Sequence, residues 1–190
     1  PNDYFRQRDM LIECLHLIQD SHKCLKPKYL SALAELTNLP LTEIYETASF
    51  YAHFDIFKDD ERVMVCSSFQ HPFYPNRHFD TPGEHLILTP INAGSDGTVF
   101  RSKVEKDFLP ALDAFKPELV LISAGFDAHT KDPLGELNFV EDDYRWITTL
   151  INDVANRHSQ SRIVSILEGG YHLGALGRSV CAHIEMMLND

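Results

Sequence analysis

The sequence lacks any apolar run of about 18 residues, the shortest stretch that reads as a membrane-spanning helix. It also lacks the start of a secretory signal, because Asp3, Arg6, Arg8 and Asp9 stand where a charged stub would lead into an apolar segment. These absences predict a protein with no membrane partner, and we expect it in the cytoplasm.

Basic residues are also scarce. The chain has 17 Lys and Arg against 28 Asp and Glu, a formal net charge of -11 and a pI near 5.3. Binding to a phosphate backbone needs clustered Lys and Arg, so we expect no nucleic-acid partner. An acidic surface instead favours cationic ligands, such as lysine-bearing peptides or polyamines.

No Cys-x-x-Cys pair occurs among the four cysteines, which are Cys14, Cys24, Cys66 and Cys181. This scattered spacing disfavours both a structural zinc site and a disulfide framework. We expect most of the four to be small residues of the core.

Residues 1–53 show helical patterns and no strand pattern, which predicts a small all-α helical bundle. Pro27 suits the first turn of a second helix, and Thr42 suits the N-cap of a third. The expected apolar faces of the three helices are Leu11, Ile12, Leu15 and Ile18, then Leu30, Leu33, Ala34 and Leu36, then Ile44, Ala48 and Tyr51.

Residues 54–190 alternate strand and helix patterns, which predicts a layered α/β domain with a parallel sheet. The expected strands are 62–67, 85–89, 118–123 and 162–167, and the expected helices are 104–115, 142–156 and a last one through Leu176, Val180, Ile184 and Met187. The continuous apolar runs favour strands that are buried on both faces. Functional loops are expected at the carboxyl ends of these strands.

One such loop, 123–133, follows the strand at 118–123. Gly125 allows a sharp turn, and Asp127 would project from the carboxyl edge, where a carboxylate can bind a cation. Asp127 and His129 together have the spacing of a ligand pair. The alternative, which spacing alone favours, is an Asx-turn at Asp127 with His129 exposed.

A second loop, 168–172, follows the strand at 162–167. The pair Gly169 and Gly170 lets a ligand approach the backbone closely, and Tyr171 is the first large side chain after it. A phenol held there can donate a hydrogen bond to a developing oxyanion. The alternative is a plain turn with a packing tyrosine.

The two loops occur in a recognisable order. Gly-Phe-Asp-Ala-His-Thr-Lys-Asp-Pro-Leu-Gly at 125–135 is followed by Leu-Glu-Gly-Gly-Tyr-His-Leu-Gly-Ala-Leu-Gly-Arg-Ser-Val at 167–180. Upstream, Asp-Ile-Phe at 55–57, Val-Met-Val-Cys-Ser at 63–67 and His-Pro-Phe-Tyr-Pro at 71–75 extend the pattern. Residues 54–190 thus resemble the C-terminal half of the zinc-dependent histone deacetylase and acetylpolyamine amidohydrolase family, which implies an incomplete arginase/deacetylase-like fold.

The resemblance implies a role for individual residues. Asp127 matches a zinc-ligating aspartate, and Tyr171 matches the tyrosine that polarises the acyl carbonyl beside the zinc. Tyr74, with Phe73 beside it, falls at the aromatic lining of the acyl channel, where Gly169 and Gly170 border the substrate. Ser67 lies where a monovalent cation is held. The implied reaction is zinc-dependent hydrolysis of acetyl-lysine or an acetylpolyamine.

Several family residues have no match in this sequence. The family's paired histidines and its Asp-x-His metal ligands precede the segment at Asp55, where this chain has Ala-Ser-Phe-Tyr-Ala-His-Phe at 48–54. The turn at 75–77 also lacks the usual glycines. A rebuilt metal site would have to recruit His53 and His129. The alternative is that each histidine is solvated or part of the core. We therefore expect impaired or absent activity, and an exposed sheet edge that invites self-association or a protein partner.

Residues 1–56, most clearly 27–56, resemble the helical start of the thioredoxin-like [2Fe-2S] subunit of complex I, NAD-linked formate dehydrogenases and NAD-reducing hydrogenases. In that family a second cysteine follows five residues after the first, but His71 stands five residues after Cys66. Four ligands are needed, so we expect no iron–sulfur cluster and a core role for Cys66. The two resemblances meet within 53–57, which suggests a fusion. A non-catalytic interaction module and an accessory segment of a redox complex are the alternative functions.

Overall fold

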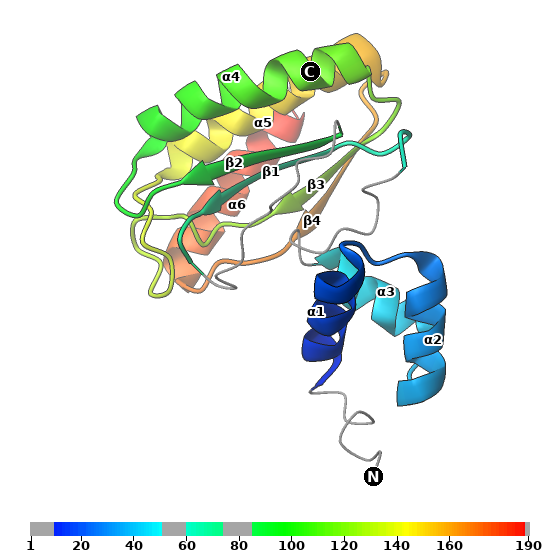
Figure 1. The fold of residues 1–190 in the computed structure, drawn as a ribbon. Helices are drawn as coiled ribbons and strands as arrows, with labels where there is room; N and C mark the ends of the chain where they lie inside the picture. The colour runs from blue at the N-terminus through cyan, green and yellow to red at the C-terminus, as the bar shows by residue number, and fades with distance from the viewer. Residues whose placement is uncertain (1–9, 51–59, 74–84, 189–190) are drawn as a thin grey trace. The chain divides into compact units, whose positions relative to one another are not determined.

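The computed structural model describes residues 10–50, 60–73 and 85–188. The chain forms two compact units. The first contains helices α1 (Leu11–His22), α2 (Pro27–Thr37) and α3 (Leu41–Phe50), and the second contains the strands and the remaining helices (Figure 1). The predicted domain boundary between residues 53 and 54 lies outside the described residues and stays a prediction.

The first unit is the helical bundle that the sequence predicts. Pro27 occupies the first turn of α2, and Lys23 and Asn38 end α1 and α2 in the left-handed conformation. Its core consists of Leu11, Cys14, Leu15, Leu25, Leu30, Leu33, Ile44 and Ala48.

Two details of the predicted helices are wrong, and one lies outside the described residues. Leu36 is exposed, because Thr37 takes the next position on the face of Leu30 and Leu33. Thr42 lies within the first turn of α3, which begins at Leu41, and so does not precede it. Tyr51 lies beyond the described part of this segment.

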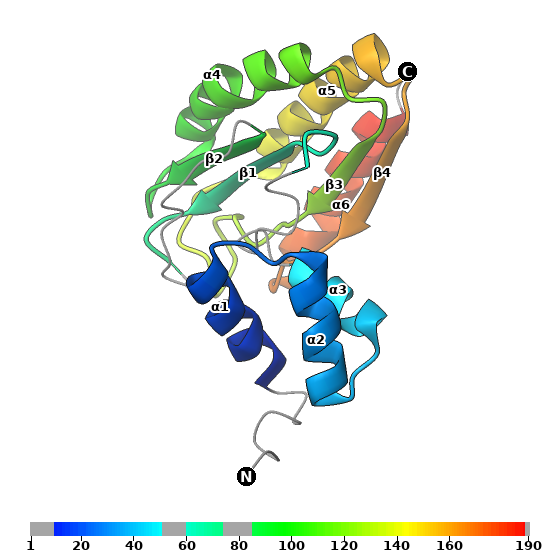
Figure 2. The same cartoon turned by 45° about the vertical axis from the view of Figure 1, so that its right-hand side comes forward.

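The second unit alternates strands and helices, as predicted. Its elements are β1 (Val65–Gln70), β2 (Leu86–Ile91), α4 (Gly97–Phe115), β3 (Val120–Ala124), α5 (Glu141–His158), β4 (Ile163–Leu167) and α6 (Leu173–Leu188). β1 pairs with β2, and β3 pairs with β4 in parallel, with Val120 opposite Ile163 and Ala124 opposite Leu167 (Figure 2). This part of the chain is therefore an α/β structure.

Helix α4 begins seven residues before its predicted start at Val104. The side chain of Asp96 accepts hydrogen bonds from the backbone N–H groups of Thr98 and Val99, so a strong N-cap starts the helix at Gly97. With 19 residues, α4 is longer than α5, which has 18.

No helix in the described ranges is both long and apolar enough to cross a membrane.

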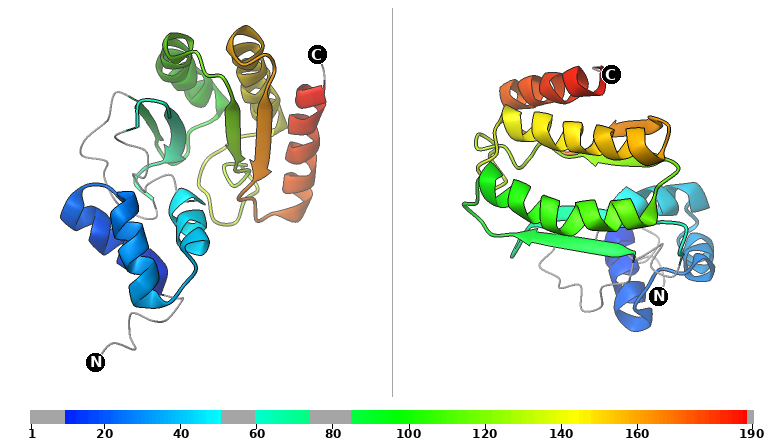
Figure 3. Two further views of the ribbon diagram at one scale, coloured as in Figure 1. Left: turned by 90° about the vertical axis from the view of Figure 1, so that its right-hand side faces the viewer. Right: turned by 90° about the horizontal axis from the view of Figure 1, so that it is seen from above.

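The helices of the second unit cover only one face of β3 and β4. α5 lies between α4 and α6 (Figure 3), and the helix-facing residues Ile122 and Ser165 are half-buried. On the other face, Leu121 is 66% exposed, and Val164 and Ile166 are exposed beside it. The prediction of strands buried on both faces is therefore wrong for β3 and β4, since no described helix of the second unit packs on this second face, which we call the open face.

The core of the second unit lies between the strands and the helices. Its buried members are Ile91, Phe100, Val104, Phe108, Phe126, Leu137, Phe139 and Tyr144. Aromatic rings contact one another through it, with Phe126 packed 5.0 Å from Tyr144 and Phe100 packed 4.6 Å from Phe139 between ring centroids. The Tyr144 hydroxyl also donates to the Phe126 carbonyl, so the core directly anchors the start of the loop after β3.

A buried histidine joins α5, α6 and β4. His183 Nδ1 lies 2.7 Å from Thr148 Oγ1, and Nε2 lies 2.8 Å from Ser165 Oγ. Thr148 donates its own proton to the Tyr144 carbonyl, so it accepts from Nδ1, which leaves Nε2 to accept from Ser165. The ring is therefore held in one neutral tautomer, and burial lowers the pKa of His183.

This network predicts a pH-dependent stability. The unfolded chain takes up a proton on His183 near the ordinary pKa of about 6.5, whereas the folded chain resists it, so the free energy of unfolding should fall as pH drops below about 6.5. His183→Gln should lose this part of the pH dependence in urea unfolding curves measured between pH 7.5 and 5. The exposed control His22→Gln should retain it, and equal loss in both variants would contradict the assignment.

Candidate functional site

The two loops singled out in the sequence meet at one corner of the second unit. Because β3 and β4 are parallel neighbours, their carboxyl ends lie at the same edge. Beyond the paired residues, Glu168 N–H donates to the Ala124 carbonyl at 3.0 Å and Phe126 N–H donates to the Gly169 carbonyl at 2.8 Å. The pairing thus carries the loop at 125–135 alongside the loop at 168–172.

Asp127 occupies the contact between the loops. A Cβ atom on Gly169 would lie 2.5 Å from Asp127 Oδ2, so only glycine lets the carboxylate lie here. Burial raises the pKa of Asp127, and the nearby Asp132 adds to that rise. None of the ion pairs formed among the described residues involves Asp127. Within the described residues, this half-buried carboxylate therefore has no cationic side chain that forms an ion pair with it.

Tyr171 lies at the mouth of the same corner, with its side chain 57% exposed. Gly170 precedes it with a φ of +140°, a conformation that side-chain-bearing residues rarely adopt. The Tyr171 N–H donates to Asp132 Oδ2 at 2.8 Å, and Asp132 belongs to the other loop.

The structure therefore brings Asp127, Gly169, Gly170 and Tyr171 together, and adds Asp132, which sequence reasoning missed. The signal that was available is an Asp directly before a Pro in a loop, which marks a turn whose carboxylate caps backbone N–H groups.

His129 is part of the core at this corner. Its side chain is 2% exposed, and its Nδ1 accepts the Lys131 N–H at 3.0 Å. Its Nε2 points at Glu141, with 3.4 Å to Oε1. These contacts favour the core role over metal ligation, and the exposed position expected in the Asx-turn reading is wrong. His53 lies outside the described residues.

A complete metal site does not form within the described residues. No group of three or more His, Cys, Asp and Glu side chains there could hold a metal ion. A catalytic zinc takes three protein ligands and a water, so the described residues do not by themselves fit zinc. Asp127 alone fits as one ligand, because a half-buried, uncompensated carboxylate is the kind of group that a cation would stabilise.

The other predicted site residues lie on or beside β1. Ser67 is half-buried in β1, and Phe73 is exposed just after that strand. Tyr74 lies outside the described residues. Gln70, at the end of β1, accepts the Glu136 N–H at 2.8 Å and donates to its carboxylate at 2.8 Å, which ties β1 to the stretch after the first loop. The roles of Ser67, Phe73 and Tyr74 stay predictions.

Cys66 is half-buried in β1 and packs against the core of the second unit, as expected. Burial raises the pKa of its thiol to about 12, which keeps it protonated near neutral pH. Cys14 and Cys24 are buried in the first unit, whereas Cys181 is exposed. Three of the four cysteines therefore lie in or against a core.

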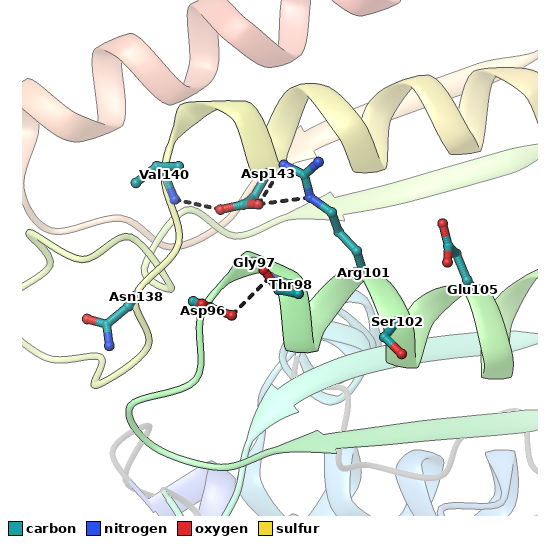
Figure 4. Close-up of a pocket in the computed structure, with 9 residues that line it drawn as sticks. All are labelled: Asp96, Gly97, Thr98, Arg101, Ser102, Glu105, Asn138, Val140 and Asp143. Atoms are coloured by element: carbon teal, nitrogen blue, oxygen red, sulfur yellow. Dashed lines mark hydrogen bonds and ion pairs between the residues drawn. The ribbon is translucent and has the colours of Figure 1, made fainter.

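A separate pocket of about 600 Å³ lies where α4 and α5 begin (Figure 4). Two of its charged groups pair with each other: Arg101 donates twice to Asp143 Oδ1, and Asp143 Oδ2 accepts the Val140 N–H at 2.9 Å. Asp96 is used as the cap of α4. These bonds hold α4 against α5, which gives the pocket a structural role.

Comparison with known proteins identifies this fold. A model of the histone deacetylase domain matches residues 52–187. The chain belongs to the histone deacetylase family. The solved HDA15 HD domain is similar, with a TM-score of 0.65 and 28% identity, over 72% of this chain and 40% of that one. The deacetylase resemblance and its α/β fold are therefore confirmed.

Two deacetylase relatives show how much of the family length is present. Histone deacetylase 14, chloroplastic, from Arabidopsis thaliana is 32% identical over 142 residues, which cover 72% of this chain and 34% of that protein. Polyamine deacetylase HDAC10 from Mus musculus is 33% identical over 147 residues, which cover 71% of this chain and 22% of that protein. The chain thus spans well under half the length of these deacetylases.

The N-terminal part also has a match. A model of the thioredoxin-like [2Fe-2S] ferredoxin matches residues 2–71, which confirms the second resemblance. Residues 52–71 belong to both the ferredoxin match and the deacetylase match. This overlap includes the stretch 53–57, where the sequence suggests that the two resemblances meet.

The contact between Asp127 and Gly169 can be tested by a substitution that adds a methyl group at Gly169. Gly169→Ala should lower the free energy of unfolding by about 1–3 kcal/mol, because the added Cβ must displace the carboxylate. Gly177→Ala is the matched control: it lies within α6, where nothing approaches the added Cβ, and should raise stability by about 0.5–1 kcal/mol. Chemical unfolding measures both. A Gly169→Ala variant as stable as the wild type would show that the corner is not packed as described.

Proposed function

We propose that this chain provides part of a hydrolytic deacetylase site, in which Asp127 is a zinc ligand and Tyr171 a catalytic hydrogen-bond donor. The observation that carries this proposal is the corner itself. In a member of the histone deacetylase family, the lone carboxylate of Asp127 lies against Gly169, and Tyr171 follows two residues later with its ring exposed.

The residues of the corner suit this chemistry. A zinc ion bound through Asp127 would supply a Lewis acid for attack of water on an acetamide. The Tyr171 O–H donates a hydrogen bond to the carbonyl oxygen as negative charge develops there. Gly169 and Gly170 are proposed to border the substrate through their backbone, because the space beside their Cα atoms is filled by Asp127 at Gly169 and by Leu176 and Phe126 at Gly170. Phe73 and Tyr74 provide an aromatic lining for the acyl chain, and Ser67 contributes to a monovalent-cation site.

The substrate class is an acetylated amine, either acetyl-lysine in a peptide or an acetylpolyamine. The mouse relative is a polyamine deacetylase by name, and the Arabidopsis relative is a histone deacetylase. An acetylpolyamine keeps positive charge on its remaining amines, and a lysine-rich peptide keeps it on its unacetylated lysines, which the net charge of -11 attracts.

Activity of these 190 residues alone is proposed to be impaired. Residues 48–54 stand where the family has its histidine pair and Asp-x-His ligands, and they offer His53 and no carboxylate. Asp127 is one ligand where three are needed. Zinc binding by the chain alone should therefore be weak, and the remaining ligands must come from elsewhere.

Metal content and hydrolysis test this proposal together. The chain should bind zinc weakly, Asp127→Ala should abolish that binding, and an acetyl-lysine reporter and an acetylpolyamine should show little turnover. Isothermal titration and a fluorogenic assay measure the two quantities. Asp142→Asn, which changes an exposed carboxylate, should behave as the wild type.

The contrary outcome is equally specific. Zinc bound near one per chain, with turnover that both Asp127→Ala and Tyr171→Phe abolish, would show a complete site and would contradict the proposed impairment. Tyr29→Phe in the helical unit is the control for loss of a hydroxyl. Zinc binding that survives in Asp127→Ala would remove Asp127 from the site.

The open face favours a second role as an interaction module, and we propose self-association through it. Leu121, Val164 and Ile166 form an apolar surface on a two-stranded sheet, a surface that water does not solvate well. Leu121→Glu should shift the chain toward monomer in sedimentation experiments. Leu36→Glu, at an equally exposed leucine of α2, should not. A wild-type chain that is monomeric at high concentration would refute self-association through this face.

The helical segment is proposed to hold no iron–sulfur cluster. The match to the ferredoxin model contains Cys14, Cys24 and Cys66, one fewer than the four ligands that a [2Fe-2S] cluster needs. Cys14 is a buried member of the helical core, and burial raises its pKa, which disfavours the thiolate form that ligates iron. An accessory role in a redox complex would therefore rest on protein contacts.

A further inference from the structure

One carboxylate, that of Asp132, ties the two loops of the corner together. Asp132 lies five residues after Asp127 in the loop that follows β3. Its Oδ1 accepts the N–H groups of Leu134 at 2.9 Å and Gly135 at 3.1 Å, both within its own loop. Its Oδ2 accepts the Tyr171 N–H at 2.8 Å, from a residue 39 positions later.

Asp132 is itself held firmly. Its backbone N–H donates to the His129 carbonyl at 2.7 Å, and His129 is buried. The Thr130 N–H donates to the Phe139 carbonyl at 2.9 Å, which closes the base of the loop. The carboxylate therefore projects from a fixed backbone toward the loop at 168–172.

Tyr171, in contrast, has little packing to fix it. More than half of its side chain is exposed, and Gly170 before it adds backbone freedom. A hydrogen bond from its backbone N–H to a carboxylate is charge-assisted, and such bonds are roughly twice as strong as neutral ones. The bond to Asp132 fixes the point from which the Tyr171 ring projects.

We propose that Asp132 is a positioning residue for Tyr171. It touches no substrate: it acts by holding the Tyr171 backbone, so that the phenol projects from a fixed point of the loop that lies against the Asp127 carboxylate. The proposal rests on the proposed function for its catalytic consequence, but the positioning itself is a property of the folded chain. The competing interpretation is that Asp132 merely caps its own turn through Leu134 and Gly135.

Asp132→Asn separates the two interpretations. The asparagine Oδ1 can still accept from Leu134 and Gly135, but its Nδ2 group donates and cannot accept the Tyr171 N–H. Hydrogen exchange resolved at single amides by NMR should show the Tyr171 amide exchanging at least about fivefold faster, because a charge-assisted bond is lost. The Leu134 and Gly135 amides should change by less than about twofold. Asp142→Asn, an exposed carboxylate at the start of α5, should leave all three amides unchanged.

Unchanged exchange at Tyr171 in Asp132→Asn would overturn the proposal. So would faster exchange at Leu134 and Gly135 equal to that at Tyr171, because the residue would then be a simple turn cap. These outcomes are read without any activity, so they are independent of whether the chain hydrolyses an amide.

A second measurement links positioning to catalysis in any preparation that turns over an acetyl-lysine reporter. Asp132→Asn should lower kcat at least about fivefold with KM changed by less than about twofold, because it displaces a transition-state donor and not a substrate-binding group. Adding it to Tyr171→Phe should cause little further loss. If exchange at Tyr171 responds but Tyr171→Phe leaves the turnover of such a preparation unchanged, positioning stands and the proposed function fails.

Discussion

The carboxylate of Asp127, held between two loops with no ion-pair partner among the described residues, is the constraint on which the rest of the corner depends. Burial and the neighbouring Asp132 both disfavour its ionised form. Gly169 leaves room for this carboxylate because it has no side chain. The parallel pairing of β3 with β4 places the second loop beside it. A fold that only needed stability would place a neutral or apolar group at this contact. This is the observation that supports the proposed cation-binding role of Asp127.

The second unit also exposes one apolar face of its β3–β4 sheet. Its helices cover one face of β3 and β4 and leave Leu121, Val164 and Ile166 on the open face. A two-stranded sheet with one bare apolar face is marginal by itself. The chain spans well under half the length of the deacetylases it matches. Among the described residues, neither the corner nor the open face has its full set of contacts: Asp127 forms no ion pair there, and no helix of the second unit covers the open face.

Much of this could be read from the sequence, because it depends on local patterns. The alternation of strands and helices, the pairing of Asp127 with a Gly-Gly-Tyr loop, and the core position of Cys66 follow from periodicity and from motif order. The rest depends on contacts between distant residues. The burial of His129 places it near Glu141, twelve residues later, and the bond from Asp132 to Tyr171 spans 39 residues. The early start of α4 is different, because the Asp96 cap is a local signal that the sequence reading overlooked. The open face was missed because a continuous apolar run looks the same whether one or both of its faces are covered.

The most direct test of Asp127 as a metal ligand is the thermal unfolding midpoint of the wild type and Asp127→Asn at pH 7, each with and without excess zinc. The raised pKa means that the ionised carboxylate costs stability above its ordinary titration range, so the neutral amide should raise the metal-free midpoint. Zinc should raise the midpoint of the wild type alone. A lower metal-free midpoint in Asp127→Asn, together with an undiminished response to zinc, would show that Asp127 is a structural group and not a ligand.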